Sequence, residues 1–224
     1  MPLRKIVFAA GETYHIVNRG VASVPIFNTP SEYWRFLLLI DYYRFISPSL
    51  SFSFYDRLSK TEKDEFKKNL LKKGVPQVEV FAYCLMPNHF HFLVKQLEER
   101  GIQKMFANVQ NAYSKYFNLK NKRSGPLFQS RFKAVWIETD EVFLHISRYI
   151  HLNPSTSYLV SIDDLSSYEW FSYPEYTLER ESVFTDTDTI LKMVGGSKKY
   201  QNFVLNQADY QKKLHVIKHL MLEK

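Results

Sequence analysis

The pattern of apolar and polar positions along this chain predicts four β-strands. Apolar side chains alternate with polar ones, or form short runs bounded by turn residues, at 13–20, 78–85, 90–95 and 132–137. Residues 86–88 contain Pro87 and Asn88 and are expected to join the second and third strands as a hairpin.

Apolar residues at helical spacing predict three principal helices between these strands. One begins near Pro30 with Ser31 as its N-cap, and a second covers 101–119. The third is capped by Thr139 and is expected to end near 152, because Pro154 follows. The order strand–helix–strand–strand–helix–strand–helix is a split βαβ pattern. It predicts an α+β fold, in which an antiparallel sheet carries its helices on one face.

Two segments lie outside this pattern. Residues 46–77 are predicted to be an inserted arm, with a serine-rich turn at 47–53 and a mixed-charge helix at 58–73 that Gly74 and Pro76 stop. From Ser155 onward the chain is aromatic and irregular to Tyr176, and a short helix is expected near 187–194. We therefore expect a main domain at 1–154 and an extension at 155–224 that packs on or beside it.

The composition narrows the class of protein. Of the 224 residues, 45% are hydrophobic and 24% are charged, which is typical of a globular domain. Cys84 is the single cysteine, so an internal disulfide and a Cys-x-x-Cys metal or redox motif are both excluded. The apolar run at 6–10 is too short for a signal peptide, and no segment is long enough for a membrane span. A cytoplasmic location is expected.

The net charge of +7 is concentrated in one stretch. Residues 101–137 contain no Asp or Glu, whereas lysines, arginines, amides and aromatic residues alternate throughout. A merely solvated surface usually mixes charges of both signs. Cations and aromatic rings without acids suit a phosphate backbone and unstacked bases, so a nucleic acid is the favoured partner. An anionic small molecule is the weaker alternative.

The segment at 86–94 places His89 and His91 one residue apart on a predicted strand. Their side chains therefore project from one face, while those of Phe90 and Phe92 project from the other. Two imidazoles on one face provide half of a divalent metal site. The alternative is a strand whose solvent-facing side carries two histidines by chance.

The third predicted helix has an apolar stripe that includes Ile146 and ends in Tyr149 and Asn153. Taken alone, these are a packed tyrosine and an asparagine that helps to end the helix. Together with His89 and His91, they fit a nucleophile and a third metal ligand. Tyr113 and Tyr116 are rival nucleophiles, but their spacing predicts core or base-stacking positions.

Several segments resemble HUH single-tyrosine transposases, and most closely the REP-associated tyrosine transposase group. These are residues 87–91, 125–132 and 148–154, with further similarity at 18–20 and 168–173. The resemblance covers most of residues 11–175. The arm at 46–77 departs from the compact family pattern.

The resemblance implies a ferredoxin-like fold and a metal-dependent enzyme that cleaves and rejoins single-stranded DNA near hairpins. It assigns Tyr149 as the nucleophile of a 5′-phosphotyrosine intermediate. His89, His91 and Asn153 would hold Mg²⁺ or Mn²⁺, where an imidazole pair favours Mn²⁺. A cytoplasmic, nucleoid-associated monomer or homodimer is expected. A non-catalytic, domesticated DNA-binding module on the same fold is the alternative.

Eight residues are candidates for DNA contact because they are cationic or carry amides near the expected site. They are Asn18, Arg19, Lys115, Lys122, Arg123, Gln129, Arg131 and Lys133. The enzyme and the binding module differ in one observable feature. Only the enzyme requires the Tyr149 hydroxyl to lie near the face that carries His89 and His91.

Overall fold

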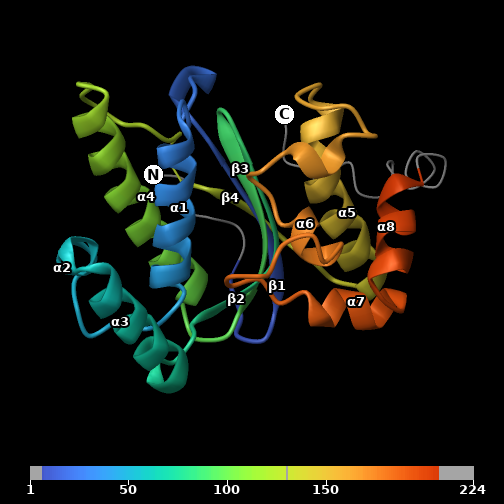
Figure 1. Ribbon diagram of the computed structural model, residues 1–224, viewed down its shortest axis with the longest axis horizontal. Helices are drawn as coiled ribbons and strands as arrows, with labels where there is room; N and C mark the ends of the chain where they lie inside the picture. The colour runs from blue at the N-terminus through green and yellow to red at the C-terminus, as the bar shows by residue number, and fades with distance from the viewer. Residues whose placement is uncertain (1–6, 130, 207–224) are drawn as a thin grey trace.

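A four-stranded antiparallel sheet forms the middle layer of the protein, in a computed structural model that describes residues 7–129 and 131–206 (Figure 1). The strand order is β2-β3-β1-β4. The strands are β1 (Thr13–Arg19), β2 (Val78–Met86), β3 (His89–Gln96) and β4 (Lys133–Trp136). Strands β1 and β2 therefore flank β3, which is the split βαβ arrangement that the sequence predicts.

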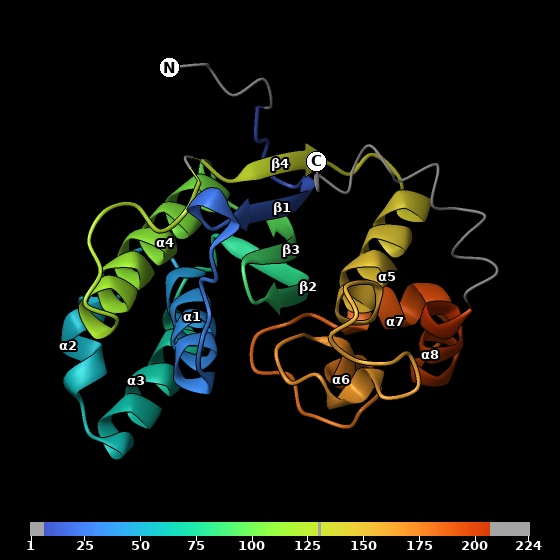
Figure 2. The ribbon, with the colours of Figure 1, turned by 90° about the horizontal axis from the view of Figure 1, so that it is seen from above.

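Helices cover both faces of this sheet (Figure 2). Helices α1 (Pro30–Tyr43) and α4 (Gly101–Lys120) lie together on one face, as the split βαβ pattern predicts. Helix α5 (Asp140–Thr156) lies on the other face, and the C-terminal extension packs around it. The α+β fold class is confirmed. The prediction that the helices share one face holds for α1 and α4 but is wrong for α5, which follows the split motif and covers the second face of the sheet.

The core between the sheet and helices α1 and α4 is aromatic. Phe90 and Phe92 of β3 are fully buried against Phe36 of α1 and Phe106 of α4. The centroid of the Phe90 ring lies 5.1 Å from that of the Phe36 ring and 5.8 Å from that of the Phe106 ring. Because strand side chains alternate, burying these two phenylalanines here directs the residues on either side of Phe90 toward α5.

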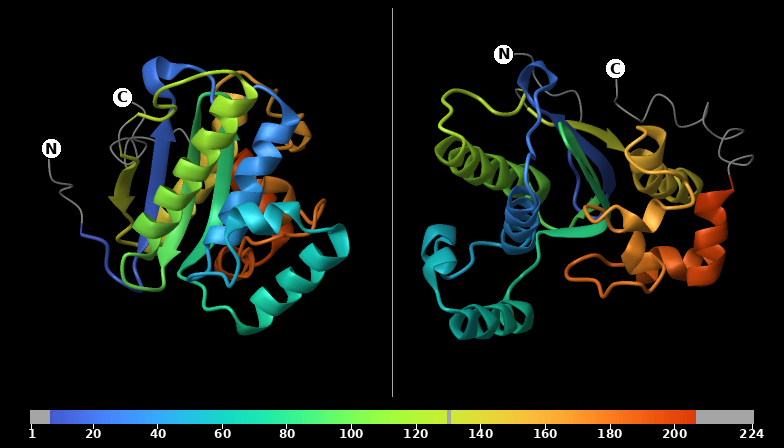
Figure 3. Two further views of the ribbon diagram at one scale, coloured as in Figure 1. Left: turned by 90° about the vertical axis from the view of Figure 1, so that its left-hand side faces the viewer. Right: turned by 45° about the horizontal axis from the view of Figure 1, so that its top comes forward.

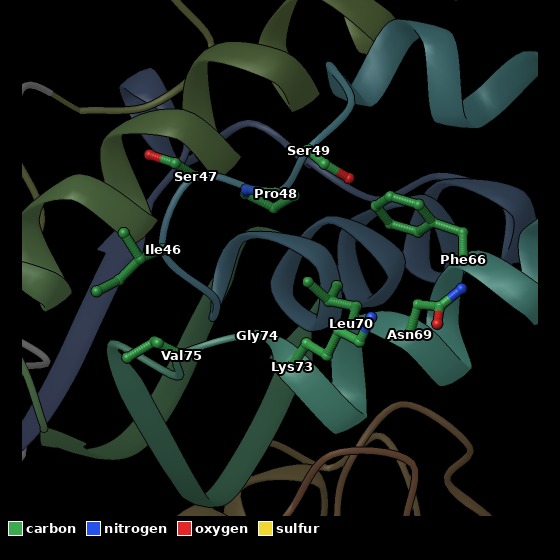
Figure 4. Close-up of a pocket in the computed structure, with 10 residues that line it drawn as sticks. All are labelled: Ile46, Ser47, Pro48, Ser49, Phe66, Asn69, Leu70, Lys73, Gly74 and Val75. Atoms are coloured by element: carbon green, nitrogen blue, oxygen red, sulfur yellow. The ribbon is translucent and has the colours of Figure 1, made fainter.

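The arm contains two helices where one was predicted. Helix α2 (Phe52–Arg57) begins inside the predicted turn, because the Ser51 hydroxyl accepts a hydrogen bond from the Phe54 backbone N–H. Helix α3 (Lys60–Lys73) follows Ser59, which forms a capping box with Glu62. A pocket of about 390 Å³ lies between the loop that precedes α2 and the side of α3 that carries Phe66 and Leu70 (Figure 4).

The two ends of the arm meet at its base. The Ile46 backbone N–H donates to the Val75 carbonyl at 2.8 Å, and Phe45 and Pro76 form an antiparallel bridge beside this bond. The arm extends on the same side of the sheet as α1 and α4, away from α5 (Figure 3).

Two predicted helix ends were wrong. Thr29, not Ser31, is the N-cap of α1, because Glu32 reaches back to complete a capping box with it. Pro154 does not end α5, which continues to Thr156. A proline in the last turn removes only its own N–H, and the next turn still closes, since the Ser157 N–H donates to the Asn153 carbonyl at 3.0 Å.

The C-terminal extension contains more helix than was predicted. Its elements are η2 (Leu165–Ser167), α6 (Tyr173–Tyr176), α7 (Asp188–Val194) and α8 (Ser197–Leu205). Helix α7 matches the predicted segment, whereas α8 was not predicted. The remainder of the predicted extension, 207–224, lies outside the described residues. Within the described ranges, no helix combines the length and apolar character needed to cross a membrane.

Candidate active site and nucleic-acid interface

The two predicted histidines lie at the start of β3, directly after the hairpin turn. Their rings are neighbours, with centroids 4.9 Å apart. The side chain of His91 is fully buried and that of His89 nearly so. Both lie on the face that α5 covers. The alternative of a solvent-facing strand with two chance histidines is therefore wrong, because this face is part of the protein interior.

Tyr149 of α5 reaches this pair in the same chain. Its ring meets His91 edge-on, with centroids 5.6 Å apart and an interplanar angle of 89°. Tyr149 is itself buried, with 3% of its surface exposed. The structure thus brings together a nucleophile candidate and a metal-ligand candidate that the sequence places 58 positions apart (149 minus 91).

A third histidine, which the sequence analysis did not identify, completes the cluster. His15 of β1 is fully buried, and its Nε2 lies 2.9 Å from Nδ1 of His91. The two rings stack, with centroids 5.2 Å apart. Tyr149 also meets the His15 ring edge-on, at 5.9 Å. The available signal was a polar residue within the otherwise apolar run from Tyr14 to Val17.

Asn153 follows Tyr149 by one helical turn and is buried. Its Nδ2 donates to the Tyr149 backbone carbonyl at 3.2 Å. The side chain therefore lies on the Tyr149 side of α5. Its role as a third metal ligand stays a prediction.

The electrostatic surroundings keep His91 neutral. Burial, together with the smaller effect of the positive charge of Arg19, lowers the pKa of His91 to about 3. Arg19 lies directly opposite His89 in the β1–β3 ladder, so the two share a face of the sheet. A neutral imidazole is the form that binds metal ions.

The donor atoms fit a divalent ion held by two imidazoles. His91 Nδ1 is bonded to His15, and His89 Nδ1 lies 2.6 Å from the Asn88 side-chain oxygen. Metal-ligating histidines are typically held in this way through the other ring nitrogen, so both would coordinate through Nε2. In the part of the chain that the structure describes, no group of three His, Cys, Asp or Glu side chains could hold an ion. An amide, water or substrate oxygen would therefore complete the coordination.

Helix α5 is fixed to the C-terminal extension by residues that flank Tyr149. The His151 ring lies between the Tyr200 hydroxyl, at 2.7 Å from Nδ1, and the Ser172 hydroxyl, at 2.8 Å from Nε2. Arg148 donates to the Phe203 backbone carbonyl at 3.0 Å. His151 and Arg148 are fully buried, and burial lowers the pKa of His151 to about 3. None of these three contacts was predicted.

A row of candidate DNA-contacting residues continues from the histidines across the sheet. Val17 lies opposite His91 on one side and opposite Lys133 on the other, so Lys133 faces the same way as His91. Lys133 is exposed, as is Arg131, which precedes β4. The exposed Gln129 is joined to the end of β1, because its backbone N–H donates to the Arg19 carbonyl at 2.8 Å.

The remaining candidates differ in how accessible they are. Lys115 and Lys122 are exposed. Arg123 folds back on its own loop and donates to the Asn118 side chain at 3.0 Å and to the Pro126 carbonyl at 2.7 Å.

Asn18 was expected to contact DNA, but the structure places it differently. It is buried on the α1–α4 face, and its amide donates to Gln110 at 2.7 Å. The register explains this, since Asn18 pairs with Phe90 and not with a histidine. Asn18 therefore holds α4 against the sheet and is not exposed for contact with DNA.

The rival tyrosines do not lie at the histidine face. Tyr113 is buried in the aromatic core on the opposite face, and its hydroxyl donates to the Ile26 carbonyl. Tyr116 packs beneath the guanidinium of Arg35, which lies 4.6 Å from its ring centroid.

Comparison with known proteins finds one matching family model. Residues 54–153 match the family model described as "Transposase IS200 like". This segment of the chain is similar to IS200-like transposases. It includes the histidine pair and Tyr149, and it ends at Asn153. The resemblance to HUH single-tyrosine transposases is therefore confirmed.

A solved structure has the same fold as this chain. It is described as "Structure of the REP associates tyrosine transposase bound to a REP hairpin". The match has a TM-score of 0.51 and 15% sequence identity, and it covers 84% of this chain and 96% of the other. No curated protein sequence matches the chain.

Proposed function

We propose that this protein cleaves and rejoins single-stranded DNA beside hairpins, through a 5′-phosphotyrosine formed on Tyr149. The observation that carries the proposal is the edge-on contact of the Tyr149 ring with His91 within one chain. The REP hairpin bound to the structural relative supports the choice of a hairpin substrate. Such an enzyme would act in the cytoplasm on nucleoid DNA.

The residues divide the chemistry among them. The Tyr149 oxygen attacks the scissile phosphorus and loses its proton, and the bond from phosphorus to the 3′-oxygen breaks. The DNA 5′ end is then attached to Tyr149, and the departing 3′-oxygen takes up a proton. Attack by a 3′-hydroxyl on this ester reverses the step and joins the strands, so no nucleotide cofactor is needed.

His89 and His91 would hold Mg²⁺ or Mn²⁺ through Nε2, with Asn153 as the proposed third ligand. A divalent ion at this position supplies Lewis-acid polarisation of the phosphate. Arg19 lies opposite His89 and adds positive charge on the same face. A guanidinium pairs well with phosphate oxygens, so Arg19 is suited to orient the strand at the cleavage point.

The proposed DNA path runs over the surface next to these groups. Lys133 and Arg131 extend the histidine face across β1 and β4, and Gln129 borders the end of β1. Lys115 and Lys122 are also exposed, and they lie within residues 101–137, which contain no Asp or Glu. These cations would neutralise backbone phosphates without reading the sequence.

The decisive experiment traps the covalent intermediate. Wild-type protein, Tyr149→Phe and Tyr116→Phe are incubated with end-labelled, hairpin-bearing single strands and Mn²⁺, and adducts are resolved by denaturing electrophoresis. Tyr149→Phe removes only the hydroxyl, so adducts should disappear while DNA binding stays within about two-fold of wild type. Tyr116→Phe should form adducts as wild type does.

Two results would contradict the proposal. Adducts that persist in Tyr149→Phe would place the nucleophile elsewhere. Tight DNA binding by the wild-type protein without any adduct, for a range of hairpin substrates, would instead favour the non-catalytic binding module.

A further inference from the structure

We propose that His15 is a positioning residue, which fixes the ring and the tautomer of His91 so that His91 presents Nε2 to the metal ion. This inference rests on the metal site of the proposed function. It concerns the one histidine of the cluster to which neither the family match nor the sequence assigns a role.

The geometry is that of a direct imidazole–imidazole hydrogen bond. His15 Nε2 and His91 Nδ1 are 2.9 Å apart, and both side chains are fully buried. The rings are nearly parallel, with an interplanar angle of 17°. His15 pairs with Leu93 in the β1–β3 ladder, so it reaches His91 diagonally across the same face of the sheet.

Two neutral imidazoles can form this bond in only two ways. If His15 Nε2 donates, the proton of His91 lies on its own Nε2, and that nitrogen cannot bind a metal ion. If His91 Nδ1 donates, the lone pair of His91 lies on Nε2, and the proton of His15 lies on Nδ1. Each ring carries one proton in both cases, so coordination selects one tautomer pair without gain or loss of a proton.

His89 shows why this bond matters for His91 in particular. The partner of His89 Nδ1 is the side-chain oxygen of Asn88, which can only accept. His89 must therefore donate through Nδ1, and its Nε2 lone pair is fixed. The partner of His91 can donate or accept, so the tautomer of His91 depends on that of His15.

The test measures metal binding without DNA. Binding of Mn²⁺ to the metal-free protein is followed by electron paramagnetic resonance for wild type, His15→Phe and His15→Gln. His15→Phe keeps a buried ring but removes the acceptor, so we expect about 10–100-fold weaker binding. His15→Gln supplies an amide oxygen, as Asn88 does for His89, and should restore affinity to within a few-fold of wild type. His91→Ala, which lacks one of the two proposed ligands, is the control for loss of Mn²⁺ binding.

A second measurement does not depend on how well a variant folds. In the wild-type protein with Mg²⁺, nitrogen-15 NMR of the imidazoles should show His91 protonated at Nδ1 and His15 at its own Nδ1. Protonation of His91 at Nε2 would overturn the inference. So would wild-type Mn²⁺ affinity in a folded His15→Phe protein, or a His15→Gln protein that binds as weakly as His15→Phe.

The outcomes separate this inference from the proposed function. Wild-type protein that binds Mn²⁺ in the expected way but forms no DNA adduct would contradict the proposed function alone. Wild-type protein that binds no Mn²⁺ would overturn the inference, whatever the adduct assay shows.

Discussion

The two faces of the central sheet bury very different side chains. Toward α1 and α4, β3 presents Phe90 and Phe92 to an aromatic core. Toward α5, the same strand presents His89 and His91 to a tyrosine and a third histidine. Burying an apolar ring stabilises the fold, whereas burying an imidazole costs free energy unless it is hydrogen-bonded. The difference indicates that one face provides stability and that the other preserves a chemical arrangement.

Truncating one side chain on each face tests most directly whether the two faces have different roles. Phe92→Ala should lower the free energy of unfolding by about 3–5 kcal/mol, because it leaves a cavity among buried rings. His91→Ala should cost much less stability but reduce DNA adducts to background. Urea denaturation measures the first effect, and adduct trapping measures the second.

Chelation serves as the control for this pair. EDTA added to wild-type protein should reproduce the adduct loss of His91→Ala while leaving the unfolding curve close to that of the metal-free protein. An active His91→Ala protein, or one that loses as much stability as Phe92→Ala, would show that the two faces do not divide these roles.

A smaller effect on adduct formation should distinguish hydrogen bonds that hold α5 in place from hydrogen bonds that only stabilise the fold. Tyr200→Phe removes the hydroxyl that bonds His151 and Ser147, and Tyr176→Phe removes one that donates to the Phe81 carbonyl of β2. Each should lower the free energy of unfolding by about 1–3 kcal/mol. Only Tyr200→Phe should slow adduct formation, because only its hydroxyl fixes the helix that carries Tyr149. Equal rates of adduct formation in the two variants would show that the C-terminal extension only stabilises the fold.

The smallest expected effect concerns DNA affinity. Lys122→Ala should flatten the dependence of log affinity on log salt by roughly 0.7, the value for one neutralised phosphate on a single strand. The cleavage position should not move. Because Arg123 closes its own loop, Lys122 is the cleaner choice for this substitution. A salt titration that matches wild type in slope would remove Lys122 from the DNA path.

The sequence predicted the features of this site that depend on a local period. Alternation placed His89 and His91 on one face, and helical spacing placed Tyr149 and Asn153 on one stripe. Alternation also implies that Asn18 and Arg19 point to opposite faces, and treating them as one pair of DNA contacts overlooked this. The register confirms the division, since Asn18 pairs with Phe90 and Arg19 with His89.

Contacts between segments that are distant in sequence could not be predicted from the local spacing of apolar residues. His15 meets His91 because β1 lies beside β3 in one particular register, which no local pattern specifies. The hydrogen bond between His151 and Tyr200 requires α8 to pack against α5. Gly195 and Gly196 indicate a turn before α8, but they do not indicate where α8 packs. Partners that are far apart in sequence are set by the packing of whole elements.

The closed base of the arm has a consequence for how this protein can vary and be labelled. Because the chain leaves α1 and returns to β2 at hydrogen-bonded positions, Ile46 and Val75, the arm can change in length without altering the distance between those elements. Its exposed helices lie on the side of the sheet opposite α5 (Figure 2). A fluorophore or affinity handle placed there would report on the protein while leaving the histidine face open to a DNA strand.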